Sequence, residues 1–181
     1  MNPDEQIFAL LDDLNAEADA AFGAQQALEI ADQARAEYGT VTLNARLMAA
    51  VGSEVTLDVV ALGTVQGRLS AVASSWLLLR MPQRAWVIPT AALLSCDGAP
   101  SHAVAELAWP RTAQLGLGSV LRRMADSGDP VQLVLRDGAR LTGGWRRVGA
   151  DFAELASAEG RRLVLVPFAA IAAVAQVASA S

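Results

Sequence analysis

The sequence has no lysine, and cysteine and histidine each occur only once. A single cysteine, Cys96, cannot form a disulfide within its own chain, which fits a reducing compartment. The only histidine, His102, falls in a proline-containing linker, so the sequence supports neither a histidine-based metal cluster nor a catalytic triad. We find no other catalytic constellation, and therefore predict a protein that is not an enzyme and that needs no cofactor or metal.

Long apolar runs are also absent. The longest, residues 163–178, is interrupted by Pro167 and Gln176 and is too short for a membrane-spanning helix. The chain begins with MNPDEQ, which is acidic and is not typical of a secretory signal. Hydrophobic residues make up 53% of the chain, enough to build a core. We therefore expect a soluble, cytoplasmic protein without a membrane partner or a small-molecule substrate.

Positive charge is scarce at the start of the chain. Residues 1–37 hold nine acidic residues and one arginine, a net charge of −8. Residues 38–181 hold thirteen arginines and ten acidic residues, a net charge of +3. The acidic character of the whole chain therefore belongs to its N-terminal segment, and the remainder is mildly basic.

Residues 1–40 are predicted to form an acidic helical arm, because apolar residues recur there at intervals of three and four. The helix either lies on its own domain or is a coiled-coil arm that pairs with itself or with a partner protein. The residues that would make the contact with a partner are Ile7, Leu10, Leu14 and Phe22.

The remainder of the chain contains one pattern twice. A constant offset of 76 aligns residues 55–79 with residues 131–155, including Gly67 with Gly143. The offset becomes 78 after AEGRR, residues 158–162, which is a plausible hairpin turn where insertions cost little. With the new offset Pro89 aligns with Pro167, and Leu93 aligns with Ile171. A register held over thirty residues, slipping only at a turn, predicts an internal duplication.

Each copy is predicted to be a short helix followed by about five short strands. VTLDV and VQLVL alternate apolar and polar residues, and Asp137-Gly138 is typical of a tight hairpin turn. Gly67 and Gly143 lie inside strands, where glycine indicates a bend or a bulge. We therefore expect a mainly β protein with some α-helix. Its helical arm would be followed by two small closed barrels, residues 41–97 and 115–181, each with a short leading helix and joined by the linker 98–114.

This order of elements, with a glycine in the centre of a bent strand, resembles the Sm-like family, which includes Hfq. LRDGARLTGGWRRVGADFAEL resembles the first Sm motif, and LVPFAAIAAV occupies the place of the second. The whole chain also resembles a group of actinobacterial proteins. Membership of the Sm-like family would imply small barrels that assemble edge to edge and bind RNA.

The same resemblance allows the RNA pocket of the family to be compared position by position. Trp76 and Phe152 fall where the family has the aromatic residue that stacks on a base. The asparagine that reads the base is replaced by Leu78 and Glu154, which lack the paired donor and acceptor of an amide. The Arg-Gly pair is replaced by Pro89-Thr90 and Pro167-Phe168. We therefore expect the fold of the family without its usual base pocket.

The second copy nevertheless carries arginine doublets that suit phosphate recognition. Trp145 beside Arg146 could stack on a base of a single strand. The alternatives are solvated arginines paired with local acids such as Asp151 and Glu154, or a contact with the acidic arm. The candidate nucleic-acid-binding residues are Arg140, Trp145, Arg146, Arg147, Arg161 and Arg162.

Two functions follow from these observations. The favoured one is a non-catalytic binding and assembly protein, which interacts with itself or with a protein partner through barrel edges and the acidic arm. The alternative is a regulator that binds RNA or single-stranded DNA through an arginine-rich surface of the second barrel.

Overall fold

A computed structural model describes residues 22, 26, 30, 32–157 and 162–177. The chain divides into two compact units, Met1–Val41 and Thr42–Ser181. In the first unit, residues 22, 26, 30 and 32–38 are helical, and Phe22 is exposed. The other residues proposed for contact with a partner, Ile7, Leu10 and Leu14, lie outside the described residues.

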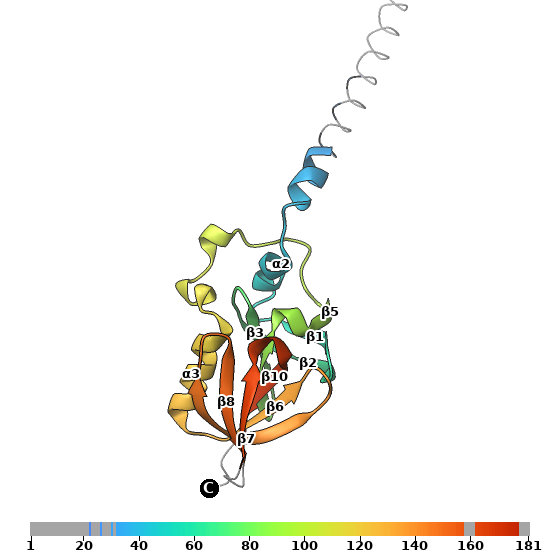
Figure 1. Cartoon of the computed structure of the whole chain (residues 1–181). Helices are drawn as coiled ribbons and strands as arrows, with labels where there is room; N and C mark the ends of the chain where they lie inside the picture. Colours follow the sequence, from blue (N-terminus) through green and yellow to red (C-terminus); the bar gives the residue numbers. More distant parts are fainter. Residues whose placement is uncertain (1–21, 23–25, 27–29, 31, 158–161, 178–181) are drawn as a thin grey trace, which may run out of the picture. The chain divides into compact units, whose positions relative to one another are not determined.

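The second unit is built on one antiparallel sheet of ten strands (Figure 1). Each strand pairs with the next in the order β5-β1-β2-β3-β4-β10-β6-β7-β8-β9. In chain order the strands are β1 (Glu54–Val59), β2 (Gly63–Val72), β3 (Trp76–Met81), β4 (Arg84–Pro89), β5 (Leu93–Asp97), β6 (Val131–Leu135), β7 (Arg140–Val148), β8 (Phe152–Ser157), β9 (Leu163–Pro167) and β10 (Ile171–Gln176).

The expectation of two separate closed barrels after a helical arm is wrong, because the strands form one open sheet. β4 pairs with β10, with Val87 opposite Val174 and Trp86 opposite Ala175. A strand at the edge of a sheet leaves a row of backbone groups without partners, and the β4–β10 pairing satisfies two such edges inside one chain. Only β5 and β9 remain at the ends of the sheet.

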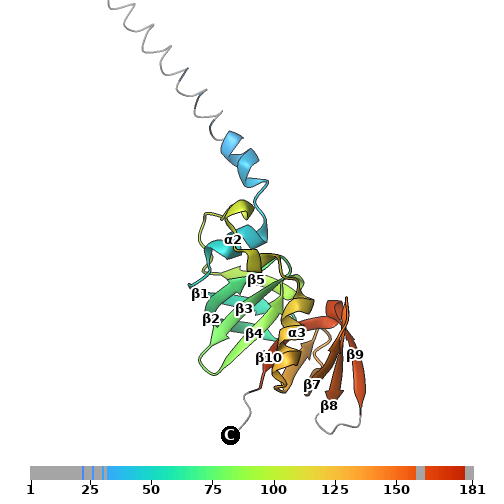
Figure 2. The ribbon, with the colours of Figure 1, turned by 90° about the vertical axis from the view of Figure 1, so that its left-hand side faces the viewer.

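The hydrophobic core is also shared across this joint. Below, the first half means residues 42–97 and the second half means residues 117–177. Val134 and Ala173 of the second half pack into the core of the first, and Val87 of the first packs into the core of the second. Figure 2 shows the green strands of the first half continuing at β4 into the red strand β10. Each half therefore has its own cluster of buried residues, and each cluster is completed by residues of the other half.

The strand order is the same in both halves. β5-β1-β2-β3-β4 in the first corresponds to β10-β6-β7-β8-β9 in the second. The register between neighbouring strands shifts between Leu69 and Ala71 and again between Trp145 and Arg147, positions that differ by 76. The halves can therefore be compared position by position.

Each half begins with a short α-helix. Helix α2 (Leu43–Ala49) begins where the Thr42 side chain accepts a hydrogen bond of 3.2 Å from the backbone N–H of Ala45. Helix α3 (Leu117–Ser127) buries three apolar residues spaced by three and four, and ends at Gly128 with φ +73°. Short 3₁₀ helices complete the unit: η1 (Thr90–Ala92), η2 (Glu106–Ala108), η3 (Arg111–Gln114) and η4 (Phe168–Ala170). None of the described helices is long and apolar enough to cross a membrane.

Three glycines have the structural roles that their sequence context suggests. Gly138, with φ +92°, closes the turn between β6 and β7. At Gly67 a Cβ atom would lie 2.5 Å from the carbonyl oxygen of Arg80, and at Gly143 it would overlap with the carbonyl oxygen of Ala156. Neighbouring strands approach so closely at these points that only glycine fits.

Candidate functional site

The arginines proposed for nucleic-acid binding lie on two separate parts of the second half. Arg140, Arg146 and Arg147 are on β7, and Arg162 directly precedes β9. All four are exposed, and none forms an ion pair or a side-chain hydrogen bond with another described residue. Arg161 lies outside the described residues. The expected local ion pairs with Asp151 and Glu154 are therefore not seen.

Strand geometry keeps these arginines apart. Six residues along a strand separate Arg140 from Arg146, which corresponds to about 20 Å. Arg147 lies directly opposite Glu154 of β8, so a negatively charged side chain is next to the positive charge at this end of β7. The structure therefore does not gather the arginines into one patch.

Trp145 is 9% exposed and lies in the core of the second half. Its Nε1 has no hydrogen-bond partner among the described residues. A covered indole offers no face on which a nucleic-acid base could stack. Trp76, at the stacking position of the Sm-like family, is 8% exposed. Its Nε1 donates a hydrogen bond of 2.7 Å to the backbone oxygen of Leu115, and the part of the side chain that remains accessible lines the groove described below.

The two ends of the sheet present apolar side chains to solvent. Leu94 on β5 is 64% exposed, and on β9 Leu163 is 58% and Leu165 is 62% exposed. At the β4–β10 joint, the position in β4 that corresponds to Leu165 is Val87, which is only 5% exposed. The edge strands therefore expose apolar side chains. At the corresponding position of the β4–β10 joint, the side chain is covered.

The lone cysteine lies on the free edge β5. Burial raises the pKa of the Cys96 thiol, and the neighbouring negative charge of Asp97 raises this pKa further. The thiol is therefore mainly protonated and weakly nucleophilic at neutral pH. In the part of the chain that the structure describes, no group of three His, Cys, Asp or Glu side chains could hold a metal ion.

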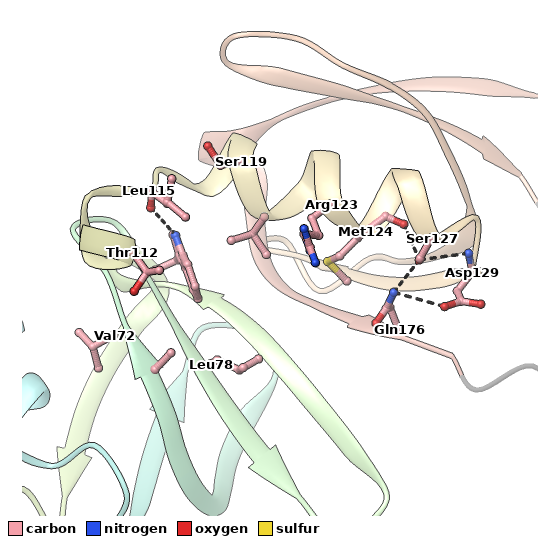
Figure 3. A pocket seen from close by; sticks show the side chains of 13 residues that line it. Val72, Leu78, Thr112, Leu115, Ser119, Arg123, Met124, Ser127, Asp129 and Gln176 are labelled. Atoms are coloured by element: carbon pink, nitrogen blue, oxygen red, sulfur yellow. Dashed lines mark hydrogen bonds between the residues drawn. The ribbon is translucent and has the colours of Figure 1, made fainter. Parts of the chain in front are cut away.

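A groove of about 650 Å³ lies at the seam between the halves, between helix α3 and strands β2 and β3 (Figure 3). Most of its lining is apolar and comes from both halves and from the segment between them: Ala71, Val72, Trp76, Leu78, Leu115, Val120 and Met124. Its polar lining residues are Thr112, Ser119, Arg123, Ser127, Asp129 and Gln176. Sequence reasoning missed this groove, because its two walls are some forty residues apart in the chain and no local pattern connects them.

No protein-family model and no curated protein matches the chain.

Proposed function

We propose that the protein is a non-catalytic assembly protein that joins further copies of itself through the free edge strands β5 and β9. The observation that supports this proposal is the β4–β10 joint. Because both halves have the same strand order, β9 of the second half corresponds to β4, and β5 of the first half corresponds to β10. Each chain thus contains one joint of this kind, between β4 and β10. It also has two free edge strands, β9 and β5, that correspond to the two strands of that joint.

The internal joint specifies a register for the external one. The offset of 78 relates Val87 to Leu165 on β9 and Val174 to Cys96 on β5. Since Val87 lies opposite Val174, Leu165 of one copy is expected to lie opposite Cys96 of the next. Directly opposite residues on paired strands point to the same face of the sheet, so these two side chains would be in contact.

The chemistry of the edges favours pairing. Edge strands of proteins that remain monomeric are usually protected by charged residues, prolines or bulges. Here Leu163 and Leu165 face solvent on a five-residue strand, although Pro167 ends it. Pairing with β5 would cover these leucines and the exposed Leu94, and would add the backbone hydrogen bonds of a strand pair.

Such a joint is head to tail, because β9 of one copy meets β5 of another. Contacts of this type produce a closed ring when the rotation between copies closes, and an open filament when it does not. The proposal does not depend on the acidic arm, whose apolar residues would add a second contact.

Light scattering of the full chain during size-exclusion chromatography tests the proposal. We expect masses that are multiples of 18.9 kDa and that rise with protein concentration. Leu165→Arg places a charge in the joint and should return the protein to 18.9 kDa. Leu107→Arg, at a fully exposed leucine in η2 that belongs to neither edge strand, is the matched control and should leave the assembly unchanged. A monomer at every concentration would contradict self-assembly.

The second candidate function, binding of RNA or single-stranded DNA, is favoured by one observation. Arg140, Arg146, Arg147 and Arg162 are exposed and unpaired among the described residues. Fluorescence anisotropy with labelled RNA and DNA oligonucleotides should then show binding that weakens steeply between low and physiological salt. No binding at low salt would remove this function.

A further inference from the structure

The seam groove has features of a small-molecule binding site. Neither half could form this site alone. Its wall on one side is formed by Trp76 and Leu78 of the first half, and on the other by Val120 and Met124 of α3. A volume of about 650 Å³ lies within the range of ligand pockets in proteins, which often occur where two parts of a chain meet.

The aromatic wall of the groove is held in place before any ligand binds. The indole N–H of Trp76 donates to the backbone oxygen of Leu115 at 2.7 Å, which ties β3 to the segment that precedes α3. The ring therefore does not have to be ordered by a ligand. A wall that is already fixed reduces the entropy lost on binding.

The polar lining contains one unpaired cation. Gln176 Nε2 donates to Ser127 Oγ at 2.8 Å and to Asp129 Oδ2 at 3.4 Å, so these three side chains interact with one another. Arg123 makes no hydrogen bond or ion pair with any other described residue. Figure 3 shows Arg123 and Met124 on the side of α3 that faces the strands of the first half.

We propose that the seam groove binds a small amphipathic carboxylate. The apolar chain or ring of the ligand would lie against Trp76, Leu78 and Met124, where its burial supplies most of the affinity. Its carboxylate would accept two hydrogen bonds from the guanidinium of Arg123, whose planar geometry matches that of a carboxylate. Because the lining is mainly apolar, and its one cation, Arg123, is accompanied by the carboxylate of Asp129, which accepts from Gln176, the structure favours a singly charged ligand over a highly charged phosphate compound.

Decanoate, used below its micelle concentration, is a suitable probe. Isothermal titration calorimetry with the full chain should show saturable binding of decanoate, weaker binding of decanol, and the weakest binding of decylammonium. Arg123→Gln should weaken decanoate by up to about fivefold, the upper end of the range for one exposed charge pair. The same variant should leave the affinity for decanol unchanged.

Arg122→Gln is the matched control. Arg122 is the adjacent arginine on the same helix, but its Nη1 is directed at the backbone oxygen of Gly149, 3.4 Å away, and it does not line the groove. This variant should bind decanoate as the unmodified protein does. Equal affinities of the Arg123→Gln and Arg122→Gln variants for decanoate would overturn the assignment of the anion site.

A second pair of variants tests the groove itself. Arg123→Glu should reverse the preference, so that decylammonium binds more tightly than decanoate. Val120→Trp should fill the groove and abolish binding of both decanoate and decanol, with circular dichroism used to confirm that the sheet is intact. No saturable binding of decanoate to the unmodified protein, or binding that Val120→Trp leaves unchanged, would overturn the proposal.

Discussion

The register proposed for the joint between copies can be tested with a single substitution, Leu165→Cys. In that register residue 165 of β9 lies directly opposite Cys96, which is the only cysteine of the natural chain. Directly opposite residues of antiparallel strands have Cα atoms about 4.5–5.5 Å apart. This separation lies within the range of about 4.4–6.8 Å that a disulfide requires. Oxidation of the variant is therefore expected to link one copy to the next.

A neighbouring position supplies the geometric control. Leu163 is on the same strand, faces solvent as Leu165 does, and lies two residues away from it. Displacement by two residues adds about 6.6 Å along the strand, so the Cα atoms of residues 163 and 96 would be about 8 Å apart. That distance exceeds the limit of about 7 Å for a disulfide without movement of the backbone. Leu163→Cys should therefore form cross-links slowly or not at all.

Non-reducing gel electrophoresis after mild oxidation is the assay. A head-to-tail joint uses the introduced cysteine on β9 of one chain and Cys96 of another, so Leu165→Cys should produce a ladder of dimers, trimers and larger species rather than dimers alone. Because the pKa of the Cys96 thiol is raised, the reaction should be carried out at about pH 9, where more thiolate is present. Combining Leu165→Cys with Cys96→Ser should remove the ladder.

Two results would refute the proposed register. Equal cross-linking of the Leu165→Cys and Leu163→Cys variants would show that the strands do not meet with residue 165 opposite residue 96. Dimers that persist when Cys96→Ser is combined with Leu165→Cys would show that two copies of β9 meet each other, which is a two-fold contact rather than a head-to-tail one.

Two further predictions concern the close approach of strands and the charges at the joint. Gly143→Ala should lower the free energy of unfolding by about 2–3 kcal/mol, because the new Cβ would overlap with the carbonyl oxygen of Ala156. Gly144→Ala, where a Cβ meets nothing within 4 Å, should change it by less than about 1 kcal/mol, and urea denaturation measures both. In the proposed register Arg162 lies diagonally across from Asp97 of the next copy, within reach of a long side chain. Arg162→Glu should therefore lower the mass measured by light scattering, and Arg162→Glu with Asp97→Arg should restore it.

The local elements of this fold could be predicted from sequence, whereas the way in which they join could not. The alternation in VTLDV and VQLVL corresponds to β1 and β6, and the Asp137-Gly138 turn connects β6 to β7. Nothing in the sequence of β4 indicates that its partner is β10, almost ninety residues later. Each half has the strands for a small barrel, and it is the pairing of β4 with β10 in the structure that shows that the sheet continues.

Arg146 and Arg147 are neighbours on β7, and both are exposed. In a regular strand, neighbouring residues point to opposite faces, so one of Arg146 and Arg147 should have faced the core. The register of β7 against β8 shifts between Trp145 and Arg147, which is the signature of a bulge. As a result both arginines are exposed and Trp145 is buried, whereas sequence reasoning took Trp145 and Arg146 to form one exposed surface.

The two proposals together predict how many ligands an assembly binds. Every joint between copies would place α2 of one chain near β8 of another, as α3 lies near β3 within a chain. The offset of 76, however, relates Arg123 to Leu47, which is buried, and relates Leu78 to Glu154. A groove at the joint would therefore lack the cation and would present a carboxylate that repels an anion. We expect calorimetry of the assembled protein to give one decanoate per chain, and a value near two would show that Arg123 does not determine where the ligand binds.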